Sequence, residues 1–332
     1  MGLRWDAISG HAGQKASLRT MLREGRLPHA LLFAGPDGIG KRMLGHVLAA
    51  AILCDSQEGP CGHCESCRAM QLGSHPDYLE VVPEQNGKSA AQIRIEAIRS
   101  MQTQVSRYPG LAKQRVVLID EADRMNEAAQ NSLLKTIEEP PAYAVVMLLA
   151  DNPDALLPTI SSRCVQLNLK PVGDQLVKDY LMNEMHVPDY QAEVDASLAQ
   201  GNIGKAERIA RSPEYEETLE SALRMAKYAD SMPLYEIVET IKKLTAEKDN
   251  IDDYFDIFSL WFRDVLLFKA TKEVDSLVFK QELNGIRERA NKSSYEGLEK
   301  IIEAIQKARA RLNANVNFDL TMELMFLTMK EN

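Results

Sequence analysis

The stretch HALLFAGPDGIGKR, residues 29–42, decides the fold of this chain. Residues His29–Ala34 predict a short buried strand that runs directly into a glycine-rich loop. The loop fits the phosphate-loop pattern G-x-x-x-x-G-K-[ST] up to its last position, where Arg42 replaces serine or threonine. Glycines let consecutive backbone N–H groups turn toward one anion, and the lysine reaches the terminal phosphates. The predicted nucleotide-binding residues of this loop are Gly35, Pro36, Asp37, Gly38, Ile39, Gly40, Lys41 and Arg42.

Arg42 changes what this loop can do with a metal ion. The residue at this position normally gives a hydroxyl oxygen to Mg²⁺, whereas arginine carries only hydrogen-bond donors and a fixed positive charge. The sequence therefore predicts a site that is built for a nucleotide but lacks one catalytic part.

Composition and charge restrict the class of protein. The chain has 332 residues, enough for two or three domains, and is 45% hydrophobic and 26% charged, as in ordinary globular proteins. Its formal net charge of −9 excludes a protein that coats DNA by charge alone, although a local basic face is compatible with it. The N-terminal residues have no apolar signal core, and the longest apolar runs are too short to cross a bilayer. We therefore expect a cytoplasmic protein without a membrane segment, in which structural disulfides are not expected.

Apolar runs alternate with helical periodicity through the first half of the chain. The expected strands are 29–34, 78–82, 115–119, 144–150 and 165–169. This alternation predicts one open parallel sheet with helices on both faces. After Pro171 the pattern is helical only, with one group of helices at 174–211 and a longer set from about residue 213. Residues 255–268 are apolar nearly all round, which predicts a helix buried on several sides. We assign packing, and no chemistry, to this half of the chain.

Four cysteines lie close together at Cys54, Cys61, Cys64 and Cys67. The two C-x2-C steps suit the tight turns that bring four thiolates to one tetrahedral Zn²⁺. Four thiolates leave no position for a catalytic water, so the predicted zinc site is structural. Unliganded thiols and an iron–sulfur cluster are the alternatives, and the cluster is disfavoured because no C-P follows the run. His63 is a further candidate that could replace one cysteine as ligand.

A second acidic motif lies about eighty residues after the loop. The strand at 115–119 ends in Asp120 and Glu121, at the sheet edge where open α/β proteins bind their ligands. In a phosphate-loop ATPase the first acid holds Mg²⁺, often through water, and the second orients or deprotonates the attacking water. An apolar strand ending in two acids is by itself an ordinary exit from a sheet, but its pairing with the loop makes it a nucleotide-site motif. We expect Asp123 to cap or pair locally.

The chain resembles a known family over residues 111–164, where VVLIDEAD (116–123) and SSRC (161–164) occur. Together with the phosphate loop, the four-cysteine insertion and the SHPD turn (74–77), this run resembles the AAA+ clamp-loader family of bacterial DNA polymerase III. The resemblance covers essentially the first 170 residues, and continues more loosely through the helical half, including LNANVNFDLTMELMFLTM at 312–329.

The resemblance implies three domains and an assembly. It implies a RecA-like AAA+ domain at 1–169 with a zinc module at 54–67, a helical lid at 170–211 and a helical collar domain at 212–332. It further implies a hetero-pentameric ring with gamma/tau motor subunits and a delta subunit. That ring opens the sliding clamp and places it on primed DNA with ATP bound between subunits.

Among clamp-loader subunits the chain is most similar to the rigid, non-motor one. The resemblance then implies that Arg163 is an arginine finger that reaches the ATP site of a neighbouring motor subunit. Without the surrounding SSRC motif, a loop arginine would be read as half of a surface ion pair of little energetic value.

Two departures from the family bear on ATP hydrolysis by the chain itself. One is Arg42, and the other is Gly204, which stands where active motors carry a sensor-2 arginine, with Lys205 as a partial substitute. Asp151 and Asn152 lie near the sensor-1 position, and Asn152 is the residue assigned to the nucleotide. We hypothesise a site that holds ATP or ADP but turns it over slowly or not at all.

Other functions remain open at this point. An active ATPase of the gamma/tau type is the main alternative, because the loop lysine and both strand-end acids are present. A zinc-containing AAA+ ATPase of DNA repair is a more distant one.

Overall fold

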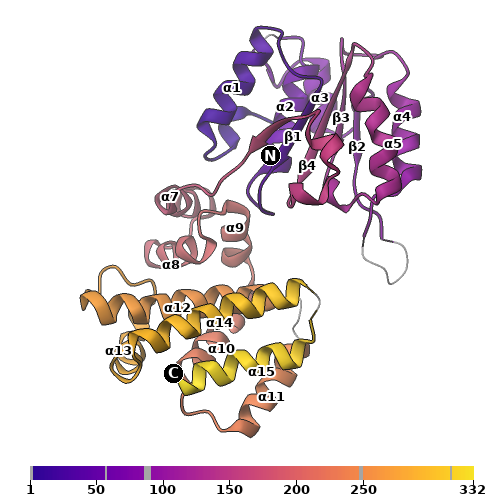
Figure 1. Ribbon diagram of the computed structural model, residues 1–332. Coiled ribbons are helices and arrows are strands. Elements are labelled where there is room, and N and C mark those ends of the chain that lie inside the picture. The colour runs from indigo at the N-terminus through magenta and orange to yellow at the C-terminus, as the bar shows by residue number, and fades with distance from the viewer. Residues whose placement is uncertain (1–2, 57, 86–90, 247–249, 315) are drawn as a thin grey trace. The chain divides into compact units, whose positions relative to one another are not determined.

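The computed structural model describes two compact units (Figure 1). The described residues are 3–56, 58–85, 91–246, 250–314 and 316–332. Residues up to Tyr180, together with Gly201–Lys205, form the first unit, and Leu181–Gln200 with Ala206–Asn332 form the second. Residue 57 of the predicted zinc module lies outside the described residues. The division into three domains at residues 169 and 211 stays a prediction.

A five-stranded parallel sheet forms the centre of the first unit, in the order β2-β3-β4-β1-β5. The strands are β1 (Ala30–Ala34), β2 (Tyr78–Val81), β3 (Arg115–Ile119), β4 (Ala144–Ala150) and β5 (Val165–Asn168). Every residue of the three central strands is buried, because helices cover both faces of the sheet. The predicted strands match these bounds to within one residue. The predicted fold class, a covered parallel sheet followed by helices, is confirmed.

Two hydrophobic cores lie on the two faces of this sheet, since successive strand residues point to opposite sides. Helices α1, α2 and α3 cover one face and α4, α5 and α6 the other (Figure 1). Their bounds are α1 (Ala12–Arg23), α2 (Lys41–Leu53), α3 (Glu65–Gln71), α4 (Ile95–Val105), α5 (Glu127–Glu138) and α6 (Pro158–Ser161). Helix α2 follows directly on the phosphate loop, and most of its residues are buried. Asn126 caps α5, because its side chain accepts from the Ala129 N–H at 2.9 Å.

Helices alone follow the sheet in the described part of the chain beyond Pro171. They are α7 (Asp174–Met185), α8 (Asp189–Ala199), α9 (Ile203–Arg211), α10 (Pro213–Tyr228), α11 (Leu234–Ala246), α12 (Ile251–Thr271), α13 (Leu283–Lys292), α14 (Tyr295–Asn313) and α15 (Phe318–Glu331). Helix α12 is buried on most sides, as its sequence predicts, and packs against α10, α13 and α14. No helix in the described ranges is both long and apolar enough to span a bilayer.

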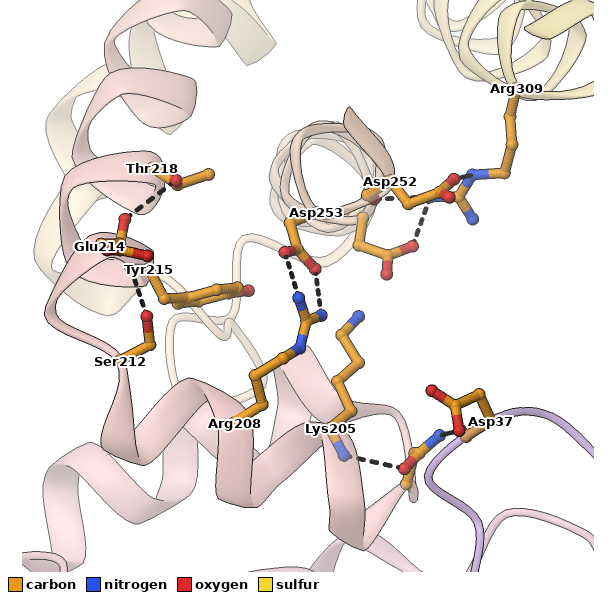
Figure 2. A network of polar contacts seen from close by, with 12 residues as sticks. Asp37, Lys205, Arg208, Ser212, Glu214, Tyr215, Thr218, Asp252, Asp253 and Arg309 are labelled. Atoms are coloured by element: carbon orange, nitrogen blue, oxygen red, sulfur yellow. Dashed lines mark hydrogen bonds and ion pairs between the residues drawn. The ribbon is translucent and has the colours of Figure 1, made fainter. Parts of the chain in front are cut away.

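Ion pairs fasten the helices of the second unit to α12 (Figure 2). Arg208 on α9 donates two hydrogen bonds to the buried carboxylate of Asp253, at 2.7 and 2.9 Å. Arg309 on α14 contacts Asp256 at 2.5 Å and lies over the ring of Phe255. The two-bond pair of Arg208 with Asp253 fixes orientation as well as distance, so it holds α9 in register against α12.

Candidate nucleotide site and cysteine cluster

The phosphate loop connects β1 to α2 at the carboxyl edge of the sheet. Gly35 has φ of 155°, and a Cβ atom there would lie 2.6 Å from the backbone oxygen of Leu169, so only glycine fits. Helix α2 begins at Lys41, immediately after Gly40. The loop therefore lies where the phosphate-loop pattern predicts, between a strand and the helix that follows it.

Lys41 is held by acceptors of its own chain. Its ammonium group donates to the backbone oxygens of Gly35 at 2.7 Å and Pro36 at 2.8 Å, and lies 2.5 Å from Asp151 Oδ1. A lysine has three donors, and these three contacts use all of them. Asp151, and not Asn152, is thus the residue at the end of β4 that reaches the lysine. The side chain of Asn152 instead accepts from the Asp154 N–H at 3.2 Å.

Arg42 bridges two acids that come from neighbouring strands. Its Nη2 lies 2.8 Å from Glu80 Oε1 on β2, and its Nε lies 3.3 Å from Asp120 Oδ2 at the end of β3. His46, one turn further along α2, contacts the same oxygen of Glu80 at 3.3 Å. Burial alone would lower the pKa of Arg42, but Glu80 and Asp120 outweigh it and raise that pKa. The predicted Mg²⁺ ligand Asp120 therefore already faces a permanent cation.

Glu121, the predicted water-activating acid, is also paired. Its Oε2 lies 2.5 Å from Nε of Arg124, and its backbone adopts a left-handed conformation with φ of 48°. Burial raises the pKa of Asp120 and of Glu121, and the neighbouring arginines oppose that effect. Asp123 accepts the backbone N–H groups of Asp151 and Asn152, both at 3.3 Å, which is the local role expected for it.

A cavity of about 390 Å³ lies over these groups. Its lining consists of Asp37, Gly38, Gly40, Lys41, Arg42, Met43, Asp120, Glu121, Arg124 and Asp151. Most of the predicted nucleotide-binding residues are thus brought together. Gly35, Pro36, Ile39 and Asn152 are predicted site residues that are not part of this lining. Each of the three cations around the cavity has a carboxylate partner from the same chain.

The segment at the start of α9 closes over the loop within the first unit. The Asn202 amide donates to the backbone oxygen of Asp37 at 2.6 Å, and the Gly204 N–H donates to that of Gly38 at 3.0 Å. A Cβ atom on Gly204 would lie 2.6 Å from the Gly38 oxygen. The position assigned to sensor 2 therefore has no room for a side chain while this contact stands.

Arg163 lies between α6 and β5, and its side chain is 41% exposed. It contacts Glu138 Oε1 on α5 at 2.9 Å and donates to the Thr159 backbone oxygen at 2.9 Å. It is not among the described residues that line the cavity of its own chain. The guanidinium is thus placed at the surface, apart from the phosphate loop.

The four cysteine sulfurs gather in one cluster, with all four within 4.8 Å of one another. Cys54 and Cys64 are 3.8 Å apart, and Cys61 and Cys67 are 3.9 Å apart. Four thiolates at about 2.3 Å from one zinc ion form a tetrahedron with edges of about 3.8 Å, so the cluster fits Zn²⁺. Backbone N–H groups of residues 56, 61, 64 and 67 point at these sulfurs at 3.4 Å. The ring of His63 contacts the backbone oxygen of Cys61 instead, at 3.0 Å, and is outside the cluster.

The sequence did not point to Glu80, His46 or Arg124 as parts of this site. Glu80 comes from the edge strand β2, and only the assembled sheet brings it to Arg42. The sequence gives a weak indication for Arg124, because it follows Glu121 at the i,i+3 spacing at which local ion pairs form.

Comparison with known proteins places these features in a family. The model of the DNA polymerase III delta subunit matches residues 10–173, and that of its C-terminal region matches residues 218–331. DNA polymerase III subunit delta' of Bacillus subtilis is 29% identical over 95% of this chain and 94% of its own length. Subunit delta' of Escherichia coli is 34% identical, over 60% of each chain. DNA polymerase III subunit tau of B. subtilis is 24% identical over 93% of this chain and 58% of its own length.

Two family models thus cover, one after the other, most of the sheet-containing half and most of the helical half. The chain spans only about three fifths of the E. coli relative that it matches. The delta' relative from B. subtilis matches it over nearly its whole length. The chain therefore belongs to the DNA polymerase III delta-subunit family.

Proposed function

We propose that this chain is the non-motor, delta-prime subunit of a DNA polymerase III clamp loader, acting in the cytoplasm. In that role it joins gamma/tau motor subunits and a delta subunit in a five-membered ring that loads the sliding clamp onto primed DNA. Its relatives named delta' support the role, and B. subtilis tau, which is also similar, supports the family.

The pairing of the catalytic groups carries this proposal. Lys41 is bound to Asp151, Asp120 to Arg42, and Glu121 to Arg124. A phosphate must displace a carboxylate to reach the lysine, and an attacking water must displace an arginine to reach Glu121. Lys41 is the buried member of these pairs, with 7% of its side chain exposed, and taking its carboxylate partner away costs several kcal/mol. The Glu121–Arg124 pair is exposed and adds at most about 1 kcal/mol. We therefore expect slow or absent turnover by this chain. A nucleotide held here serves as a structural element.

Arg163 differs from these groups because its side chain is exposed, so that a partner subunit can reach it. Its pair with Glu138 is half exposed on both sides, and such pairs contribute about 0–1 kcal/mol. Exchanging that carboxylate for a phosphoryl group costs little, and the planar guanidinium then stabilises charge that develops in phosphoryl transfer. The chain would thus complete the ATP site of its neighbour.

We further propose that Cys54, Cys61, Cys64 and Cys67 hold one structural Zn²⁺. Metal removal by a chelator is expected to release about one equivalent of zinc and to lower the melting temperature, because metal-binding energy contributes directly to folding. Elemental analysis and thermal melting check this. His63→Ala is the matched control and should keep the metal, since the ring lies outside the thiol cluster. Loss of zinc from that variant would instead make the histidine a ligand.

Reconstitution tests the proposed function. Clamp loading onto primed DNA by motor subunits, delta and this chain is expected to fall to background when the chain is left out. Fluorescence of a labelled clamp on DNA provides the measurement. If the clamp is loaded fully without the chain, the proposal that this chain is a working subunit of the clamp loader is wrong.

A further inference from the structure

The fold family implies a Mg²⁺ ion beside the phosphate loop, and the residues of this chain do not fit one. Two ligands are expected from protein, namely a hydroxyl at position 42 and the acid at the end of β3. Arginine at 42 supplies no oxygen. Asp120, the remaining ligand, has its Oδ2 only 3.3 Å from the Nε of that arginine.

The guanidinium of Arg42 stands where it neutralises the acids that would attract a metal. It contacts Asp120 on one side and Glu80 on the other, and both carboxylates are largely shielded from solvent, with 15% and 24% exposed. Glu80 also accepts from His46 on the same face of α2. Glu80 from β2, Asp120 from the end of β3, and Arg42 and His46 from α2 thus form one group of contacting side chains.

A divalent cation cannot bind among these side chains without a large cost in free energy. Mg²⁺ requires oxygen ligands at about 2.0–2.1 Å in near-octahedral geometry and usually keeps several waters, so Asp120 would hold it either directly or through one water. With direct coordination the guanidinium would lie about 4 Å from the ion, where two unit positive charges already repel by about 4 kcal/mol at an effective dielectric constant of about 20. Arginine does not lose its proton in proteins, so the repulsion is relieved only if Arg42 leaves both acids.

We propose that Arg42 is a built-in cation that excludes Mg²⁺ from Asp120, so that any polyphosphate in this cavity is bound without a divalent metal. The inference rests on the proposed function, in that it describes the nucleotide site of the same subunit. It assigns to one residue the specificity that separates this site from a metal-dependent ATPase site.

ATP binding by the full chain, measured by equilibrium dialysis in Mg²⁺ and in EDTA, tests the proposal. For the unsubstituted chain Mg²⁺ is expected to give no gain in binding. Arg42→Thr restores the hydroxyl and is expected to bind ATP about tenfold or more tightly in Mg²⁺ than in EDTA. Adding Asp120→Asn to that variant should remove the gain. Arg124→Thr is the matched control and should show no gain in ATP binding with Mg²⁺. It removes a cation from the same cavity, but one that pairs with Glu121 and not with Asp120.

Two results would overturn the proposal. One is Mg²⁺-dependent ATP binding by the unsubstituted chain that Asp120→Asn abolishes. The other is the absence of any Mg²⁺ gain in Arg42→Thr, with Arg42→Gln giving the same answer and both variants melting like the original chain. Clamp loading is scored separately with the unsubstituted chain, so failure of the proposed function and failure of this inference give different results.

Discussion

Replacing Arg163 by alanine is expected to slow hydrolysis at the neighbouring motor subunit's ATP site by about 10³-fold, the lower end of the effect of an arginine finger. The loss arises because the planar guanidinium stabilises charge that appears on the phosphoryl group only in the transition state. ATP affinity at that site should change much less. Single-turnover hydrolysis by a reconstituted assembly provides the measurement.

Two variants separate this role from a structural one. Arg163→Lys keeps the charge but loses the two-pronged donor, and should recover only a small part of the rate. Glu138→Ala removes the surface partner of Arg163 and leaves the guanidinium intact, so full activity is expected. Equal losses in Arg163→Ala and Glu138→Ala would show that their ion pair, and not a finger, is what matters.

Replacing Asp77 by alanine is expected to lower the free energy of unfolding of the first unit by about 3–5 kcal/mol. This side chain is fully buried in the SHPD turn before β2. It accepts three backbone N–H groups of residues 110–112 at 2.8–2.9 Å, and it pairs with the buried Arg115 at 2.9 Å. Alanine would leave all three donors and a buried charge without this partner. Chemical denaturation measures the change.

The same carboxylate makes stability depend on pH. Burial would raise the pKa of Asp77, but the three N–H groups and Arg115 outweigh it and lower that pKa to about 2. Because the folded pKa is below the unfolded one, the stabilisation is complete above about pH 4 and is lost as pH falls toward 2. It amounts to about 2 kcal/mol, and Asp77→Asn should lose this pH dependence. Glu24→Ala, at an exposed pair with Arg26, is the control and should change stability by less than about 1 kcal/mol.

The sheet was predictable from sequence for a specific physical reason. Strands buried on both faces appear as unbroken apolar runs, so β3 and β4 were predicted to the residue. The cysteine cluster was predictable because its ligands are near in sequence, where spacing constrains geometry.

The state of the nucleotide site was not predictable in the same way. The loop pattern identifies Lys41, yet its partner Asp151 follows β4, more than a hundred residues later. Arg42 appeared only as a missing hydroxyl, since its contact with Glu80 depends on the order of strands in the sheet. Asp77 appeared only as a turn residue, because nothing local reveals that a carboxylate will be buried against Arg115. The partners of these side chains are set by contacts between segments that are distant in sequence, and a local sequence pattern carries no information about such contacts.

ATP turnover by the isolated chain tests most directly whether this is a non-motor subunit. Hydrolysis is measured with Mg²⁺ on protein free of motor subunits, before and after addition of primed DNA and the sliding clamp. We predict no turnover above that of a Lys41→Met variant, because Lys41, Asp120 and Glu121 are each paired within the chain. Robust turnover that Lys41→Met abolishes would contradict the account and identify an active ATPase of the gamma/tau type.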